Sequence, residues 1–256
     1  MTNKEIWDIA RKQSAIDCNC NPSDFLSNQH VMTISRKHPD ARVYLPLPIA
    51  CDLVSYGSNI VAQTNTELAE IVHAYIHKYP TEHCFEVPNL HVLDNAVEPF
   101  GYKVCFMAEY FLPDVDLLTA LPCKYEMRVL HPSDFADLYK PEWSNALLEK
   151  RKELDMLAVG AYDGNTLVGL AGCSADCKDM YQIGIDVLPA YRRQGIASAL
   201  TSRLAIEVLA LGKIPFYCAA WSNIASVRNA IRSGFRPAWV ELSVRESAFV
   251  KQLNQA

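Results

Sequence analysis

The chain has 256 residues, of which 50% are hydrophobic, 21% charged and 10% aromatic, and it contains only 10 Gly and 14 Pro. This composition excludes a disordered or fibrous chain, because the apolar content is high enough to offset the entropy lost on folding. The formal net charge of −5 disfavours nucleic acid as a partner, since affinity for a phosphate backbone depends on a basic excess. The length allows one large domain or two modest ones.

The first half of the sequence predicts a mixed α/β region. Two segments show apolar residues at helical spacing, and the second of them ends at Pro80, which cannot continue a helix. The expected helices cover residues 5–16 and 66–79. Short runs rich in β-branched residues predict strands. The expected strands cover residues 31–34, 60–62 and 104–108.

A boundary is expected near the middle of the chain. Pro113 and Pro122 bracket a short acidic and apolar stretch between two well-patterned regions, which is typical of a connection between domains. We therefore predict an N-terminal α/β domain over residues 1–122 and a second domain over residues 123–256.

The second half has a more regular order of elements. A strand, a helical stretch and a hairpin are expected first, at residues 126–130, 132–154, and 157–162 with 167–173. The hairpin turns at Asp163-Gly164-Asn165, a strong turn signal. Three strands alternating with two helices follow, at residues 181–188, 195–211, 214–220, 223–233 and 239–244. A hairpin followed by strand–helix–strand units predicts an α+β fold with a mixed sheet.

The loop before the expected helix 195–211 reads Pro189-Ala190-Tyr191-Arg192-Arg193-Gln194-Gly195. A helix N-terminus offers unpaired N–H groups and the positive end of the helix dipole. Gly195 permits close approach of the backbone, and the small Ala197 and Ser198 leave the first turn uncrowded. With two guanidinium groups nearby, this loop predicts a site for a compact polyphosphate. The structural alternative is an exposed basic turn that caps a helix.

The loop matches neither common nucleotide motif, since it lacks both Gly-x-x-x-x-Gly-Lys and Gly-x-Gly-x-x-Gly. It resembles the acetyl-CoA motif of the GNAT acyltransferase superfamily, Arg/Gln-x-x-Gly-x-Gly/Ala, filled here by Arg192, Gly195 and Ala197. Downstream, Asn223-Ile224-Ala225-Ser226 and Gly234-Phe235 resemble a later signature of that family. The similarity covers residues 124–246, and the chain is also similar to uncharacterised bacterial acetyltransferases with an extra N-terminal domain.

The resemblance implies a GNAT-like, largely antiparallel mixed sheet flanked by helices, and acetyl-CoA as the co-substrate without a metal. In this family two parallel strands, here 181–188 and 214–220, splay apart and admit the pantetheine arm. The implied cofactor-binding residues are Ile185, Asp186 and Val187 along the arm, Arg192, Arg193, Gln194, Gly195, Ile196, Ala197 and Ser198 around the pyrophosphate, and Asn223 and Ser226 beside the thiol. Residues 1–122 have no implied role, although they could themselves be GNAT-like.

An amine attacks the thioester directly in this family, so the reaction needs a base for the amine and an acid for the thiolate. The tyrosine that the family often places four residues before the Gly-Phe pair is Ala230 in this chain. Tyr217 is therefore our first candidate for the acid, with Tyr181 as a second. The candidate bases are Asp186, Glu142 and Asp179.

Two other clusters favour structural interpretations. Glu70, His73 and His77 share a helical face, but their spacing differs from the His-Glu-x-x-His of a zinc helix, so solvated side chains are expected. Nine scattered cysteines do not resemble the disulfide framework of a small secreted chain, so reduced thiols are expected. The pairs Cys18/Cys20 and Cys173/Cys177 lack Cys-x-x-Cys redox spacing, and their role stays open.

Two functions fit the sequence. One is an acetyl-CoA-dependent N-acetyltransferase that transfers acetyl directly to the primary amine of a small molecule. The other is a non-catalytic acyl-CoA-binding or sensor protein, which Ala230 keeps open. No apolar run approaches the roughly 18 residues of a membrane span, and residues 1–6 lack the apolar core of a signal peptide. We therefore expect a cytoplasmic protein with a small-molecule amine partner and no membrane or nucleic acid. The oligomeric state stays open, with a homodimer as one option.

Overall fold

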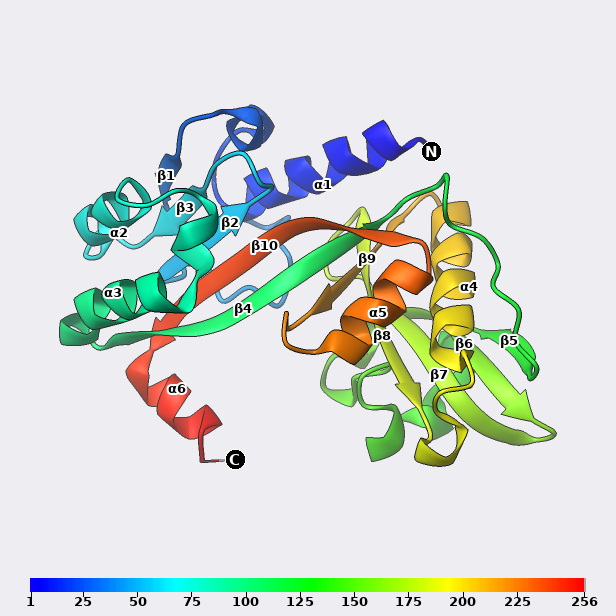
Figure 1. Cartoon of the computed structure of the whole chain (residues 1–256). Helices are drawn as coiled ribbons and strands as arrows, with labels where there is room; N and C mark the ends of the chain where they lie inside the picture. The colour runs from blue at the N-terminus through cyan, green and yellow to red at the C-terminus, as the bar shows by residue number, and fades with distance from the viewer. Residues whose placement is uncertain (256) are drawn as a thin grey trace. The chain divides into compact units, whose positions relative to one another are not determined.

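The computed structural model describes residues 1–255, which form two compact units (Figure 1). Unit 1 consists of residues 1–7 and 110–237, and unit 2 of residues 8–109 together with the chain from Ala238 onward. Helix α1 (Asn3–Asp17) and the long strands β4 (Tyr102–Pro113) and β10 (Phe235–Glu246) contribute residues to both units. The C-terminal strand and helix therefore cluster with N-terminal elements. The division into domains at residue 122 stays a prediction.

Unit 1 contains five strands in the spatial order β9-β8-β7-β6-β5. Their bounds are Glu126–Leu130 (β5), Asp155–Asp163 (β6), Thr166–Ser174 (β7), Met180–Val187 (β8) and Ile214–Ala219 (β9). Neighbours pair antiparallel, except that β8 and β9 run parallel. The two helices of this unit are α4 (Ile196–Ala210) and α5 (Ile224–Arg232). This confirms the α+β fold with a mixed, largely antiparallel sheet.

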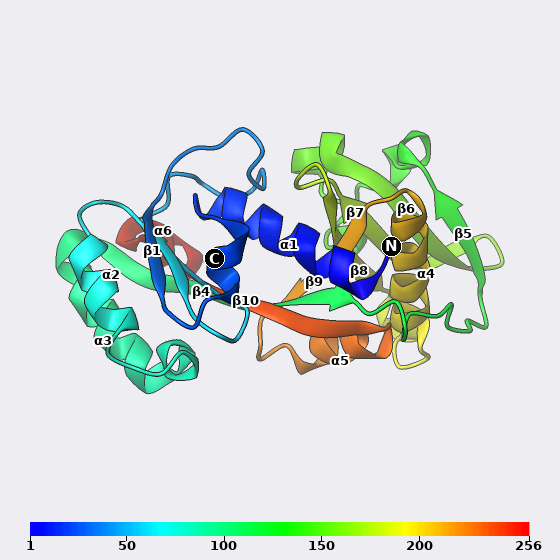
Figure 2. The same ribbon diagram turned by 90° about the horizontal axis from the view of Figure 1, so that it is seen from above.

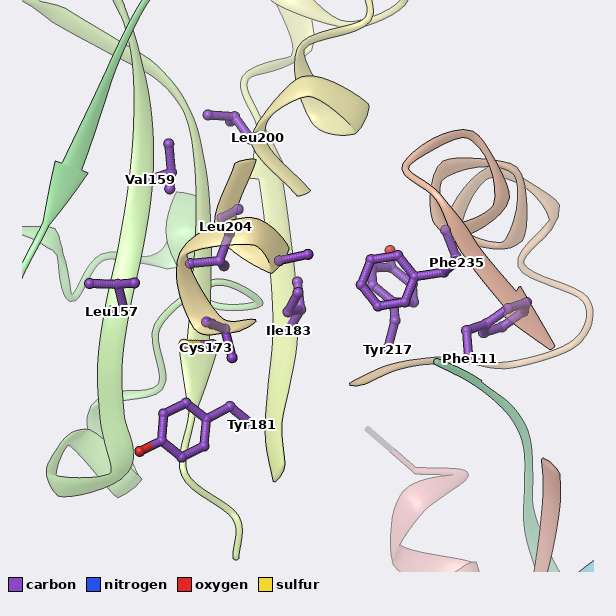
Figure 3. Close-up of a cluster of buried hydrophobic side chains, with 14 of the residues drawn as sticks. Phe111, Leu157, Val159, Cys173, Tyr181, Ile183, Leu200, Leu204, Tyr217 and Phe235 are labelled. Carbon is purple, nitrogen blue, oxygen red and sulfur yellow. The ribbon is translucent and has the colours of Figure 1, made fainter. Parts of the chain in front are cut away.

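One face of this sheet is covered by α4 and α5. The apolar stripe of α4 packs on Leu157 and Val159 of β6 and on Ile183 of β8, so that buried side chains from three elements form one core (Figure 3). Leu200 and Leu204 of α4 are fully buried in it. A helix that is apolar along one stripe buries that stripe against a sheet, which explains why the predicted helix and the observed one nearly coincide.

The other face of this sheet is covered by short 3-10 turns, where the sequence predicted a helical stretch over 132–154. The four turns are Pro132–Asp134 (η4), Ala136–Leu138 (η5), Pro141–Trp143 (η6) and Glu149–Leu154 (η7). The predicted helical stretch contains no α-helix and is broken into these turns, because Pro141 forces Lys140 into the extended region (φ −130°, ψ 156°), which no helix can contain. Trp143, Ala146 and Leu147 nevertheless form a second small core against Ala158 and Leu170.

Unit 2 contains strands in the order β1-β3-β2-β10. Their bounds are Val31–Ile34 (β1), Cys51–Ser55 (β2) and Val61–Thr64 (β3), with β10 as given above. β1 and β3 run parallel, whereas β3, β2 and β10 pair antiparallel. Its further helices are α2 (Ala69–Ile76), α3 (Val87–Val97) and α6 (Ser247–Leu253), with α2 and α3 side by side (Figure 2). Strand β2 and helices α3 and α6 were not predicted.

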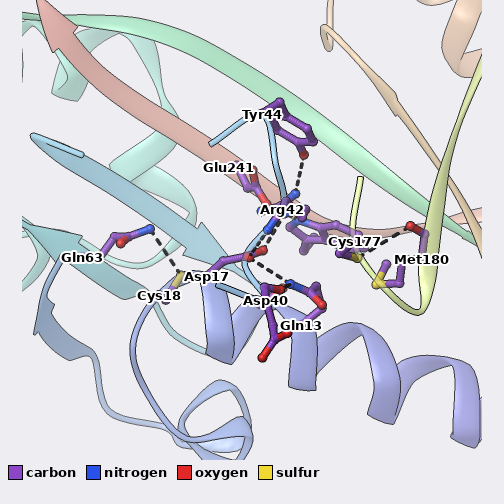
Figure 4. Close-up of polar contacts among 12 residues, drawn as sticks. Gln13, Asp17, Cys18, Asp40, Arg42, Tyr44, Gln63, Cys177, Met180 and Glu241 are labelled. Carbon is purple, nitrogen blue, oxygen red and sulfur yellow. Dashed lines mark hydrogen bonds and ion pairs between the residues drawn. The ribbon is translucent and has the colours of Figure 1, made fainter. Parts of the chain in front are cut away.

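The strands of unit 2 alternate between an apolar and a polar buried face. Leu53, Ala62 and Leu242 face the core that α2 and α3 complete, whereas Asp52 and Glu241 alternate with them in sequence. On the polar side Arg42 pairs with Asp17 and with Glu241, each at 2.5 Å, and all three side chains are buried (Figure 4). The Arg42 guanidinium thus lies among three buried carboxyl groups, which are those of Asp17, Asp52 and Glu241.

Asp52 is the carboxyl group that this arrangement leaves protonated. Burial, reinforced by the negative charge of Glu241, raises the pKa of Asp52 from 3.8 to about 8, although Arg42 opposes the rise. Between these values the unfolded chain loses the proton and the folded chain keeps it. Stability must therefore fall as the pH rises from about 4 to about 8.

We expect Asp52→Asn to stabilise the protein at pH 8, by up to about 5 kcal/mol at roughly 1.4 kcal/mol for each unit of the pKa difference, and to have a much smaller effect at pH 4.5, because the amide removes the cost of keeping a carboxyl group neutral. Thermal unfolding of the full chain at the two pH values measures the difference. The control is Asp17→Asn, which breaks the buried pair with Arg42 and should lower the Tm. Equal Tm shifts for Asp52→Asn at both pH values would contradict this account.

Candidate functional site

Strand β8 has an open edge in its C-terminal half. Its parallel pairing with β9 runs from Met180 opposite Ile214 to Ile183 opposite Tyr217 and ends there. On its other side, pairing with β7 continues to Val187. The edge of residues 184–187 that faces away from β7 therefore has no recorded strand partner in the part of the chain that is described. An extended ligand can pair with such an edge. The predicted residues Ile185, Asp186 and Val187 lie along it.

The arginine loop follows this edge directly. A 3-10 turn, Pro189–Tyr191 (η8), leads to Arg192 and Arg193, which are both exposed. Arg193 and Gly195 have positive φ values of 62° and 82°, and the second lies where glycine is favoured. The chain then enters α4 at Ile196. The loop therefore makes a sharp backbone turn between the end of β8 and the start of a 15-residue helix.

The first turn of α4 carries N–H groups without a side-chain cap, because Gly195 occupies the N-cap position. Gln194 accepts a hydrogen bond from the Tyr125 hydroxyl at 3.0 Å. The Ile196 side chain is buried in the core, and the Ser198 hydroxyl donates to Asn229 of α5 at 3.0 Å. Ile196 and Ser198 thus use their side chains to hold α4 in place. Their backbone N–H groups, with that of the half-buried Ala197, remain at the helix start.

Arg232 is a residue of this site that sequence reasoning missed. A Cβ placed on Gly195 would lie 4.0 Å from Nη2 of Arg232, at the end of α5. Among the described residues, Arg192, Arg193 and Arg232 form no ion pair with a carboxylate. Three exposed guanidinium groups therefore belong to the start of α4. The sequence signal was weak, since Arg232 is 37 positions beyond Gly195 and only helix packing brings them together.

Three predicted residues meet where β9 joins α5. Asn223 caps α5, since its Oδ1 accepts a hydrogen bond from the Ser226 N–H at 3.2 Å. The Ser226 hydroxyl lies 2.8 Å from the Tyr217 hydroxyl. Burial raises the pKa of Tyr217, and hydrogen bonding to Ser226 and Asn229 opposes the rise. Ala230 follows Ser226 by one turn and is fully buried in the core that also holds Tyr217.

The carboxylate of Asp186 is hydrogen-bonded to the 145–146 segment, which crosses β8. It accepts hydrogen bonds from Asn145 N at 2.8 Å, from Asn145 Nδ2 at 2.6 Å and from Ala146 N at 3.0 Å. Both carboxylate oxygens are therefore engaged by donors of the 145–146 segment. Asp186 therefore holds the 145–146 segment in place, and its role as a base stays a prediction.

The other candidates for acid and base differ in exposure. Glu142 is exposed on η6 and forms no hydrogen bond or ion pair with a described residue. Asp179 lies 3.7 Å from Lys213 in an ion pair. Tyr181 is buried in the core, which raises its pKa. The structure therefore brings Tyr217 and Ser226 into contact, whereas it places Glu142 on a separate turn.

Two glycines allow the 145–146 segment to cross the sheet in close contact with it. Gly172 of β7 and Gly184 of β8 stand opposite each other in the antiparallel register. A Cβ on Gly184 would overlap the carbonyl oxygen of Asn145, and one on Gly172 would overlap that of Ala146. The peptide backbone therefore lies directly on the glycine pair, which fixes the position of the 145–146 segment beside the open edge of β8.

The remaining clusters show no ligand geometry. Within residues 1–255 no group of three or more His, Cys, Asp or Glu side chains could hold a metal ion. The rings of His73 and His77 stack at 4.2 Å, and His77 meets His30 edge to face at 5.4 Å. All nine cysteines are free thiols. No helix in the described range is both long and apolar enough to span a bilayer.

Comparisons with known proteins show similarity to one family over the part of the chain that contains this site. The acetyltransferase (GNAT) family model matches residues 124–235, which include the arginine loop, α4 and α5. Similar solved structures include a GCN5-related N-acetyltransferase-like protein from Streptococcus suis, with 18% identity, a TM-score of 0.45, and coverage of 61% of this chain and 69% of that chain. A second is a GCN5-related N-acetyltransferase from Sphaerobacter thermophilus, with 17% identity, a TM-score of 0.45, and coverage of 61% of this chain and 56% of that chain. A third is a GNAT-family acetyltransferase from Colwellia psychrerythraea, with 15% identity, a TM-score of 0.42, and coverage of 57% of each chain.

A search of curated proteins gave no match. The family match spans β5 to β9, both helices of unit 1 and the first residue of β10. It thus contains every residue named above for the arginine loop, the open edge of β8 and the Tyr217–Ser226 contact. Residues 124–235 of this chain are therefore similar to the acetyltransferase (GNAT) family, whose model they match.

Proposed function

We propose that this protein transfers the acetyl group of acetyl-CoA directly to the primary amine of a small molecule. The observation that carries this proposal is the sequence of an open strand edge at residues 184–187, an arginine loop and an uncapped helix start. This arrangement suits a ligand with an amide-bearing arm at one end and a pyrophosphate at the other. The family match over residues 124–235 supports acetyl transfer from acetyl-CoA as the class of reaction.

Each part of the site has a role in holding acetyl-CoA under this proposal. The edge of Ile185 to Val187 would pair with the pantetheine arm as an added strand does. The N–H groups at the start of α4 would bind the pyrophosphate, because they are uncapped and lie at the positive end of the helix dipole. Arg192, Arg193 and Arg232 would add charge-assisted hydrogen bonds to the phosphates.

The hydroxyl pair Tyr217–Ser226 would supply the proton for the leaving group. When the amine nitrogen bonds to the carbonyl carbon, the C–S bond breaks and the sulfur leaves as a thiolate. The Tyr217 hydroxyl can donate its proton to this thiolate. It can then recover a proton through the Ser226 hydroxyl, to which it is hydrogen-bonded. The raised pKa of Tyr217 keeps the phenol protonated at neutral pH. We propose Glu142 as the base, because its carboxylate accepts no hydrogen bond from a described residue, whereas that of Asp186 accepts three.

We expect Tyr217→Phe to lower kcat about tenfold, less than the roughly 100-fold or more that is typical of general acid catalysis, since a thiolate is a good leaving group. Because burial raises the pKa of Tyr217 above its ordinary value of 10, the wild-type rate should fall only above pH 10 as the phenol ionises, and the variant should lose that decline. Steady-state rates from pH 6 to 11 measure both effects. The control is Tyr181→Phe, another buried tyrosine of the same core, which should keep the wild-type rate and profile. Wild-type kcat and an unchanged pH profile in Tyr217→Phe would refute the acid role.

A non-catalytic acyl-CoA-binding or sensor protein is the second candidate. Two observations favour it: Ala230 replaces the family's usual tyrosine, and the carboxylate of Asp186 is fully engaged with Asn145 and Ala146. Calorimetric titration with acetyl-CoA, followed by thiol-release assays over a panel of primary amines, separates the two functions. Binding with turnover on at least one amine supports the enzyme. Binding without turnover on any amine supports the sensor, and absence of binding overturns both.

A further inference from the structure

Unit 2 contains a cavity of about 420 Å³ to which neither the family match nor the acetyl-transfer proposal assigns a role. It lies at one end of the unit 2 sheet, where β2 begins, β3 ends and β10 ends. Its size is in the range of sites that bind small molecules. The buried Ile49 and the half-buried Phe249 of α6 form part of an apolar wall.

The last two residues of β10 give this cavity one charge of each sign. Arg245 lies over the ring of Phe249, 4.5 Å from its centroid, so that packing and a cation–π contact hold the guanidinium in place. Glu246 is exposed at the rim. Within the described part of the chain, neither side chain forms an ion pair. The lining of the cavity thus includes a cation and an anion that are not paired with each other.

A hydroxyl donor adds to the cationic side of the cavity. Asn65 is fixed by its own contacts, since its Oδ1 accepts from Leu68 N at 2.9 Å and its Nδ2 donates to the Tyr102 hydroxyl at 3.3 Å. The Tyr102 oxygen is therefore an acceptor in this bond, and its proton has no acceptor among the described residues. That proton is available to a carboxylate or another acceptor in the cavity.

We infer that this cavity binds a small zwitterion of the α-amino acid type with an apolar side chain. Arg245 and the Tyr102 hydroxyl bind the carboxylate, Glu246 binds the ammonium group, and the apolar side chain lies against Ile49 and Phe249. Local neutrality carries the inference: an anion alone would leave Glu246 close to a like charge, and a cation alone would leave Arg245 unmatched. The inference does not depend on acetyl transfer.

Calorimetric titration of the full chain with L-phenylalanine tests the inference. Two further probes lack one charge each: 3-phenylpropanoate has no ammonium group, and 2-phenylethylamine has no carboxylate. We expect saturable binding of L-phenylalanine at millimolar concentration or below, and at least tenfold weaker binding of both other probes. No L-phenylalanine binding up to 10 mM, or equal affinity for either single-charge probe, overturns the inference.

Variants locate the binding. Arg245→Gln and Glu246→Gln should each weaken L-phenylalanine binding at least tenfold and leave acetyl-CoA binding unchanged. The matched control is Arg128→Gln in unit 1, since Arg128 also lies over an aromatic ring, 4.3 Å from the centroid of Tyr162. It should bind L-phenylalanine as the wild type does. Unchanged affinity in Arg245→Gln would place the amino acid elsewhere and refute the assignment to this cavity.

Discussion

Replacing Arg192 with Ala and Arg193 with Gly in one variant is expected to weaken acetyl-CoA binding about 100-fold while the chain stays folded. Each charge-assisted hydrogen bond to a phosphate contributes about 1.5–3 kcal/mol. Both guanidinium groups are exposed, so solvent screening reduces that value, and a total near 3 kcal/mol corresponds to about 100-fold. Stability should be preserved because Arg193 has a φ of 62°, which glycine adopts without strain.

Calorimetric titration at low and high salt measures this effect, since the affinity carried by the two arginines should fall as ionic strength rises. The control is Arg203→Ala, which removes a positive charge from the same helix. Arg203 pairs with Glu207 in the middle of α4, away from its N-terminus. We expect that variant to bind acetyl-CoA normally. An unchanged affinity in the double variant, or an equal loss in Arg203→Ala, would show that the loop does not bind the phosphates.

Gly184→Ala is expected to destabilise unit 1 by about 4 kcal/mol, a large part of the roughly 5–15 kcal/mol that stabilises a typical domain. The added Cβ overlaps the carbonyl oxygen of Asn145, and this neighbour is backbone, which cannot rotate away. Overpacking costs about 1–3 kcal/mol. If the 145–146 segment moves instead, Asp186 loses hydrogen bonds to two backbone N–H groups, at about 1.5–3 kcal/mol each.

Chemical denaturation of the full chain measures this loss, and the matched control is Gly160→Ala on β6. There the nearest atoms are the ends of the Leu167 and Tyr162 side chains, at 2.8 and 2.9 Å, and both can rotate. We expect a change below about 1 kcal/mol for this control. If Gly184→Ala unfolds at the same denaturant concentration as Gly160→Ala, then the turn does not press on the glycine pair as the structure shows.

The elements predicted well from the sequence are those whose local pattern and tertiary environment agree. Strand β5 has the predicted bounds, and helix α4 begins and ends within one residue of the prediction. The apolar stripe of α4 faces a single sheet, so periodicity and burial give the same answer. The hairpin of β6 and β7 was found because its turn residues specify it locally.

The elements that were missed have sequences whose environment decides their structure. Strand β2 carries Asp52 at its second position and follows two prolines, so it looks like a loop. All five of its residues are buried, because each face of the unit 2 sheet is covered. Helix α3 starts with Pro88 in its first turn, and its hydrophobic pattern is weak. Neither element can be recognised without the neighbours that cover it.

The sequence by itself determined the chemistry of the loop at residues 192–198, because two arginines, a glycine and a helix start are contiguous and their properties are local. Tertiary structure alone decided which distant groups join that loop. Strand pairing leaves the edge of β8 open. Packing of α5 on α4 brings Arg232 to Gly195, and packing of α5 on β9 brings Ser226 to Tyr217. The crossing turn also gives Asp186 three donors. Such contacts depend on burial and on register between separate elements, which no local spacing encodes.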